Sequence, residues 1–197
     1  MKYLIAALFL SLMAACKPET YTPKPRGYFL INFPEHAYTE FNDPTFPYRF
    51  QYPIYGKIVK DTTFFGEKPE NPYWINIDFP DLGGRVYLSY KAVNASQPIE
   101  KLMEDAYKMT ETVHNKRADY IEPINFHIDS VKVHGLFYNV GGNAASAYQF
   151  YATDYEKHFL RGALYFDVTP NADSLKPVNE FLRTDIEYVL KSLRWKN

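Results

Sequence analysis

The hydrophobic pattern of this chain has two periods, and residues 136–168 show the shorter one. Apolar side chains recur at every second position of residues 159–168, as in a strand with one buried face. Two further strands, 136–140 and 145–152, precede it around a Gly141-Gly142-Asn143 turn. Residues 144–147 and Gly162 are small, so we expect a large group, the C-terminal helix, to lie across this sheet. One face of the predicted strand 159–168 carries Leu160, Gly162, Leu164, Phe166 and Val168.

A second pair of alternating stretches predicts a hairpin earlier in the chain. Residues 73–79 and 85–93 alternate in the same way, and the intervening sequence PDLGG is a turn signal. Residues 48–52 form a predicted edge strand, because the prolines around them argue against a central position. Further strands are predicted at 28–33, 57–60, 125–128 and 131–140. The last of these includes the strand 136–140 named above.

Two stretches show the longer period of an amphipathic helix. The first begins with Pro98 in its first turn and fades near residue 118. The second is capped by Asp173 or Ser174, with Pro177 in its first turn. The apolar stripes are Ile99, Leu102, Met103, Ala106, Met109 and Val113 in the first, and Leu175, Val178, Leu182, Ile186, Val189 and Leu193 in the second. About seven strands in mostly antiparallel hairpins, packed by two such helices, predict an α+β fold.

Composition narrows the possible partners. The formal net charge is −1 and the sequence pI is about 6.5, so nothing favours nucleic acid or electrostatic attachment to an anionic membrane. The chain holds 18 Tyr and 15 Phe, which we interpret first as core and sheet packing, because aromatic residues suit sheets.

The N-terminus indicates a compartment. Lys2 precedes an apolar stretch, residues 3–13, which is too short to span a bilayer as a helix. Ala14 and Ala15 then precede Cys16, the only cysteine, at the position where a bacterial lipoprotein is cleaved and acylated. We therefore predict a signal peptide at 1–15, a lipidated Cys16 with a proline-rich tether at 16–25, and one globular domain at 26–197.

The sequence offers no motif for catalysis. His127, His134 and His158 lie on or beside predicted strands, but without the spacing of a known metal motif, so a metal-dependent enzyme is a weak alternative. The chain has no Gly-x-Ser-x-Gly elbow. Asp78 and Asp167 lie on outer strand faces with nothing to pair them as glycosidase acids. We predict no enzymatic activity and no cofactor.

Several stretches together resemble the gliding motility lipoprotein GldD family of the Bacteroidota. The longest of these are the central run 135–166, with GGNAAS and HFLRGALYF, and the last helix, with DSLKPVNEFL. Shorter ones are PKPRGY at 23–28, FPY at 46–48, YWIN at 73–76 and RVYLSYK at 85–91. The order of strands and helices is also similar to a Mog1/PsbP-type sandwich.

The resemblance implies a cell-envelope lipoprotein required for gliding and tied to the type IX secretion system. It implies a non-catalytic accessory component that acts through protein contacts, with a GldJ-like lipoprotein as a plausible partner by family association. The lipid on Cys16 would attach it to a membrane. We expect the periplasmic face of the outer membrane, with the inner membrane as the alternative, because no acidic run follows Cys16.

The candidate partner surface consists of residues directly after the tether and aromatic residues of the proline-rich region 41–55. We name Arg26, Tyr28, Phe29, Phe46 and Tyr48, because loops held by proline present aromatic side chains at low entropic cost. The alternative for these aromatics is packing over the sheet edge. A separate functional alternative is a periplasmic lipoprotein that binds or hydrolyses glycan, which would need aromatic side chains beside paired carboxylates in a cleft.

Overall fold

The computed structural model describes residues 27, 30–60, 69–114 and 116–196. The chain divides into two units, Met1–Ile31 and Asn32–Asn197, and all elements named below belong to the second. In chain order these are β1 (Tyr38–Phe41), β2 (Tyr48–Pro53), β3 (Lys57–Lys60), β4 (Ile75–Phe79), η1 (Pro80–Leu82), β5 (Gly84–Ala92), α2 (Ile99–His114), β6 (Ala118–Ile128), η2 (Asp129–Val131), β7 (Val133–Gly142), β8 (Tyr148–Thr153), β9 (His158–Phe166), α3 (Ala172–Ser192) and β10 (Arg194–Trp195).

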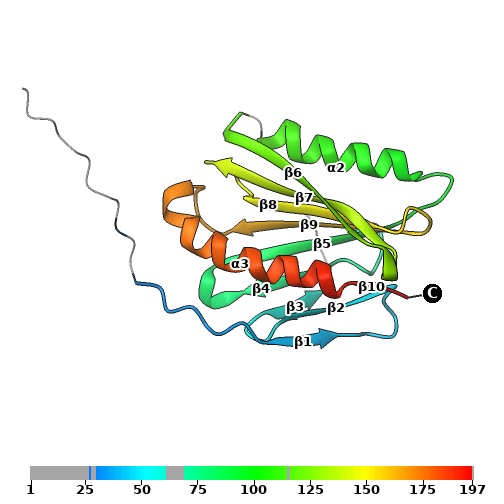
Figure 1. The fold of residues 1–197 in the computed structure, drawn as a ribbon, viewed down its shortest axis with the longest axis horizontal. Helices are drawn as coiled ribbons and strands as arrows, with labels where there is room; N and C mark the ends of the chain where they lie inside the picture. The colour runs from blue at the N-terminus through cyan, green and yellow to red at the C-terminus, as the bar shows by residue number, and fades with distance from the viewer. Residues whose placement is uncertain (1–26, 28–29, 61–68, 115, 197) are drawn as a thin grey trace, which may run out of the picture. The chain divides into compact units, whose positions relative to one another are not determined.

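Seven strands form one sheet in the order β3-β4-β5-β9-β8-β7-β6, and each neighbouring pair is antiparallel. The two helices lie on opposite faces of this sheet (Figure 1). Tyr151 of β8 packs against α2, whereas its neighbour Phe150 lies with Ile186 and Val189 of α3. Consecutive side chains of a strand point to opposite faces, so this pair fixes the layers. The α+β prediction is confirmed.

The apolar stripe of α3 forms one half of the core, with Val178, Leu182, Ile186, Val189 and Leu190 buried. The space above Gly162 is filled by Phe150, its partner across the β8–β9 pair. A Cβ on Gly162 would lie 2.2 Å from the phenyl ring. The large group that lies directly against Gly162 is therefore the Phe150 side chain of the neighbouring strand β8. The helix α3 packs on the far side of that ring. β8 begins at Tyr148, so residues 145–147 lie in a loop.

The helix predictions hold in position and differ in detail at the second N-terminus. α2 starts directly after Pro98, whose carbonyl accepts bonds from the amides of Lys101 and Leu102. The N-cap of α3 is Asn171 rather than Asp173 or Ser174, because its extended backbone lets the side chain accept from the Ser174 amide. Pro177 lies inside the helix, one turn later than predicted.

A second, three-stranded sheet has the order β1-β2-β10. β2 is its central strand, which differs from the predicted edge position, and the nearest prolines lie before the strand or at its last residue. The described part of the predicted strand at 28–33, residues 30–33, is not in a strand, and β1 at Tyr38–Phe41 was not predicted.

β6 extends from Ala118, seven residues before the predicted start. This added part of the strand contains Pro123, which cannot donate a ladder hydrogen bond. Since β6 pairs only with β7 among the described strands, it is an edge strand, and an edge can accommodate proline.

Candidate functional site

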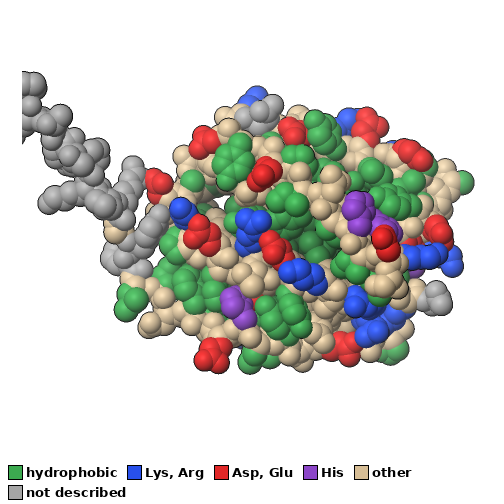
Figure 2. Space-filling model, in the orientation of Figure 1, with side chains coloured by type: hydrophobic (Ala, Val, Ile, Leu, Met, Phe, Trp, Pro, Cys, Tyr) green, Lys and Arg blue, Asp and Glu red, His purple; other side chains and the backbone are tan. Residues whose placement is uncertain are grey.

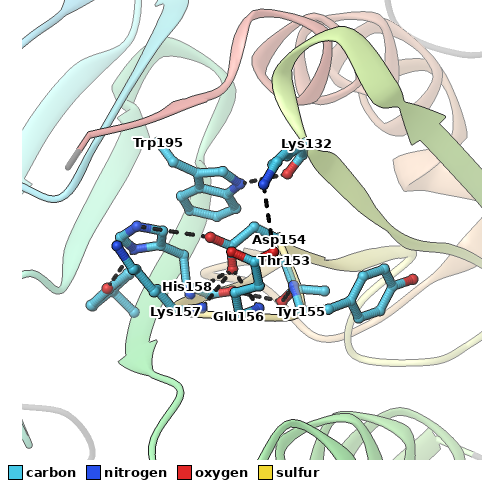
Figure 3. Close-up of polar contacts among 9 residues, drawn as sticks. Lys132, Thr153, Asp154, Tyr155, Glu156, Lys157, His158 and Trp195 are labelled. Carbon is cyan, nitrogen blue, oxygen red and sulfur yellow. Dashed lines mark hydrogen bonds and ion pairs between the residues drawn. The ribbon is translucent and has the colours of Figure 1, made fainter.

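The end of the chain is held in the fold by Trp195 of β10. Its indole ring stacks on the imidazole of His158, with centroids 5.0 Å apart and 9° between the planes. Its Nε1 donates to the carbonyl of Lys132 at 3.0 Å, and Figure 3 shows the indole between these two residues. Lys132 Nζ lies 3.5 Å from Glu156 Oε1. The tail is therefore tied to the β6–β7 turn and the β8–β9 turn together.

The β8–β9 turn is built around Asp154 (Figure 3). Its Oδ1 accepts hydrogen bonds from the amides of Glu156, Lys157 and His158 at 3.0, 2.8 and 2.8 Å. Burial raises the pKa of Asp154, but these bonds outweigh burial and lower the pKa below its ordinary value. The carboxylate is thus committed to holding the turn.

His158 lies between two groups that could suggest a catalytic relay. The hydroxyl of Tyr90 is 2.8 Å from Nδ1, and Oδ2 of Asp154 is 4.0 Å from Nε2, which is beyond hydrogen-bond distance. Tyr90 is 5% exposed and His158 is 8% exposed. Burial raises the pKa of Tyr90 to about 12 and lowers the pKa of His158, so both groups remain neutral near pH 7. This arrangement packs the tail and offers no exposed nucleophile.

The buried histidine makes stability depend on pH. Because burial lowers the pKa of His158 below its ordinary 6.5, the unfolded chain takes up a proton at a higher pH than the folded chain. The stabilisation is fully present above pH 6.5 and is lost as pH falls toward the folded pKa; burial of His114 acts in the same direction. We expect a lower urea midpoint at about pH 5.5 than at about pH 7.5.

Two variants separate this effect from other titrations. His158→Gln should show a smaller drop in the urea midpoint between the two pH values, whatever its own stability. His127→Gln, at an exposed position of β6, should keep the wild-type drop. A wild-type protein that is equally stable or more stable at the lower pH would contradict the prediction.

The histidine pair considered for metal binding is adjacent but incomplete. Nδ1 of His127 and Nδ1 of His134 are 3.4 Å apart across the β6–β7 pair, and Asp129 Oδ1 lies 3.6 Å from His134 Nδ1. His158 is engaged with Tyr90 and Trp195 instead. Within the described ranges, no group of three His, Cys, Asp or Glu side chains is arranged to hold a metal ion.

Two of the predicted partner residues are buried. Phe46 is 5% exposed, and Tyr48 is fully buried with its hydroxyl donating to the carbonyl of Tyr73 at 2.6 Å. The two rings meet edge to face, 5.6 Å apart. Both side chains are packed inside the domain and are not part of an exposed surface. Cys16, Arg26, Tyr28 and Phe29 lie outside the described residues.

A buried carboxylate on α3 was not found from the sequence. Asp185 is fully buried, and its Oδ1 lies 2.8 Å from His36 Nδ1 and accepts from the Tyr38 hydroxyl at 3.0 Å. Its Oδ2 accepts from the Tyr55 hydroxyl. Asp185 stands one position before Ile186, inside the apolar stripe. An acidic residue on the apolar face of the helix could have indicated this cluster from the sequence, because a buried carboxylate needs hydrogen-bond partners.

Aromatic stacking extends this attachment along α3. Phe181 stacks on Phe33 and on His36, with centroids 4.4 and 4.5 Å apart, and Tyr38 stacks on Tyr188 at 3.7 Å. The segment from Phe33 to Tyr38 is therefore fixed to the helix by both polar and aromatic contacts.

An apolar groove of about 440 Å³ runs between β6 and α3. Figure 2 shows hydrophobic side chains at the surface between these elements. Arg183 and Glu187, 2.8 Å apart, form an ion pair on its wall. The apolar lining comes from Ile124, Phe126, Ile128, Phe137 and Leu190.

The two halves of β6 differ in how the edge is protected. The first half carries a register irregularity between Ala118 and Tyr120, then Glu122 and Pro123. Irregularities, charges and proline all block pairing with a further strand. The second half, from Ile124 to Ile128, has none of these and borders the groove. Such an edge can accept an extended peptide through main-chain hydrogen bonds, with alternate side chains in the groove.

The carboxylates considered for glycan hydrolysis are not arranged as a pair. Asp78 receives two bonds from Arg85, at 2.6 and 2.8 Å, which occupy both of its oxygens. Asp167 is exposed beyond the end of β9. The groove beside β6 has a single carboxylate on its wall, that of Glu187.

The fold and these surfaces define an α+β domain with a helix on each face of an antiparallel sheet. The family model of the gliding motility lipoprotein GldD matches residues 18–195. The chain belongs to this family. A search of curated proteins finds no match.

Among solved structures, the chain is similar to the solution structure of cyanobacterial PsbP (CyanoP) from Synechocystis sp. PCC 6803. The sequence identity is 15% and the TM-score is 0.48, with 85% of this chain and 98% of that chain covered. Among the described helices, none is both long and apolar enough to cross a membrane.

Proposed function

We propose that this protein is an envelope-anchored, non-catalytic accessory component of the gliding motility and type IX secretion machinery, acting through protein–protein contacts. The observation that carries this proposal is the family match over residues 18–195. The lipid on Cys16 holds the protein at the membrane, at the periplasmic face of the outer membrane, and residues 16–25 tether the domain. A GldJ-like lipoprotein is the first partner to test.

The contact surface in this proposal is the open half of β6 with its groove. An extended segment of the partner would pair with the backbone of Ile124–Ile128 and place alternate apolar side chains against Phe126 and Leu190. The groove volume of about 440 Å³ lies in the range of natural binding sites. The aromatic residues Tyr28 and Phe29 remain a second candidate surface.

The test compares the native host strain with a full deletion and with Cys16→Ala. We expect the deletion to abolish release of type IX cargo and colony spreading, and Cys16→Ala to leave the membrane fraction with the same loss. Lys17→Ala, which keeps the cysteine, is the matched control and should behave as wild type. A deletion strain that secretes and spreads normally would remove the proposal.

The contact itself is tested in the same strains with a photo-crosslinking amino acid. Placed at Phe126, it should capture a defined envelope protein of the motility or secretion machinery. Placed at Tyr107, 53% exposed on α2, it should not capture the same protein. Equal capture from both positions would count against the β6 surface.

A further inference from the structure

A polar cluster lies beneath α2, on the face of the sheet opposite α3. Gln149 of β8 is 1% exposed, and its Oε1 accepts a hydrogen bond from Arg161 Nη2 at 2.5 Å. Thr110 of α2 is also buried, and its Oγ1 lies 3.3 Å from the same Oε1 and 3.0 Å from the carbonyl of Ala106. Helix and sheet therefore meet here through polar side chains in an otherwise apolar interface.

Arg161 is the charged residue of this cluster. Among the residues that the structure describes, no carboxylate forms an ion pair with its guanidinium. Burial lowers the pKa of Arg161, which means that the surroundings disfavour its charge. An arginine nevertheless stays protonated in proteins, and its planar fork carries five N–H donors. Gln149 accepts from one of these donors and Tyr165 hydrogen-bonds to the same side chain, so the remaining N–H groups leave capacity for an anion.

Three neighbouring buried polar atoms have no hydrogen-bond partner within the part of the chain that the structure describes. They are His114 Nε2, the Tyr138 hydroxyl and Gln149 Nε2, all in residues at most 2% exposed. Arg161 influences the pKa of both His114 and Tyr138, which places them within its electrostatic reach. Since more than about 90% of buried polar atoms in proteins are hydrogen-bonded, the surroundings of Arg161 are unusually polar for a helix–sheet interface.

A groove of about 120 Å³ leads from the surface to Arg161. Ser89 supplies a hydroxyl, and the apolar walls include Met109 and Phe159. Two further charged residues line it: Lys91, which is paired with Glu70 at 3.0 Å, and Asp105. At about 30 Å³ for each water molecule, this volume corresponds to about four waters, which is room for a small organic molecule.

We propose that this groove binds a small monocarboxylate, whose carboxylate is held by the N–H donors of Arg161 that Gln149 and Tyr165 do not use and by the Ser89 hydroxyl. Its short apolar chain lies against Met109 and Phe159. A carboxylate matches the fork of arginine with two parallel hydrogen bonds. The apolar walls favour a carboxylate with an alkyl chain over inorganic phosphate. The negative charge of Asp105 on the groove wall repels the bound carboxylate and lowers its affinity. This site is independent of the proposed role in motility and secretion.

The test is calorimetric or NMR titration of the purified full chain with butyrate, with inorganic phosphate as the comparison probe. We expect butyrate to bind more tightly than phosphate. Arg161→Gln should weaken butyrate binding at least about tenfold, the loss expected for one bidentate charged contact. Arg183→Gln, which removes an exposed arginine from α3, is the matched control and should leave binding unchanged.

Two surface variants keep the test decisive if Arg161→Gln fails to fold. Asp105→Asn should tighten butyrate binding several-fold, because it removes the opposing charge. Met109→Glu, at a position 49% exposed on the groove wall, should weaken it. No binding by wild type, binding unaffected by these changes, or phosphate bound more tightly than butyrate would each overturn the proposal.

Discussion

Gly135→Ala is expected to lower the free energy of unfolding by about 3 kcal/mol, the upper range for overpacking a core position. Gly135 is buried in β7, and a Cβ there would lie 1.9 Å from the carbonyl oxygen of Tyr151 in the neighbouring strand. The opposing atom is backbone, so no rotamer change relieves the overlap. The β7–β8 pair must shift as a whole, which disturbs the ladder and the core on both faces. Urea unfolding of the purified chain measures the loss.

The same strand contains a matched control. A Cβ on Gly141 would lie 2.1 Å from the ring of Tyr120, but that ring is 53% exposed and can turn into solvent. Gly141→Ala should therefore cost about 1 kcal/mol or less. Equal losses for the two variants would show that the close approach of β7 and β8 is not what requires glycine at position 135.

Asp185→Ala is the second large effect, again about 3 kcal/mol, because it removes the buried carboxylate that accepts hydrogen bonds from three side chains, and a hydrogen bond to a charged group contributes about 1.5–3 kcal/mol. His36, Tyr38 and Tyr55 all hydrogen-bond to Asp185, which is itself fully buried. Asp185→Asn keeps an acceptor oxygen and should lose less. Besides the urea midpoint, limited proteolysis should show faster cleavage between Phe33 and Tyr38, since that segment is held to α3 at this point.

Glu180→Ala on the same helix is the control for removal of a carboxylate. Glu180 lies 3.7 Å from Lys176, and both side chains are about three-fifths exposed. Exposed pairs of this kind contribute about 0.5 kcal/mol or less. If Asp185→Ala is no more destabilising than Glu180→Ala, or leaves the proteolysis pattern unchanged, the buried cluster does not hold the segment.

Local periodicity was enough to predict most of the large sheet and both helices. The hairpin of β4 and β5 and the helix α2 follow from side-chain spacing and turn residues within the same short stretch, so they can be read from sequence. β1 and β10 could not be predicted this way, because each is defined by pairing with β2, and β10 lies more than 140 positions from it. The edge position of β6, which accommodates Pro123, is likewise a property of the assembled sheet.

The candidate sites were harder to predict from the sequence, because their residues also come from distant parts of the chain. The polar partners of Asp185 lie 130 to 149 positions away, and nothing near it in the chain indicates them. Arg161 occupies the outer face of a strand where a solvated arginine would be ordinary. Only the register of β8 and β9 and the position of α2 place it among buried polar groups. The adjacency of His127 and His134, by contrast, follows from one predicted hairpin.

The pairing of β10 with β2 sets the order in which the domain can be completed during synthesis. β1 and β2 are synthesised early. The third strand of their sheet, β10, and the contacts of Trp195 form only after residues 194 and 195 have left the ribosome. Contacts between such distant positions form late, because a long loop must close first. The small sheet is therefore the last part of the domain to close. Until then, one edge of β2 has no partner strand among the described elements.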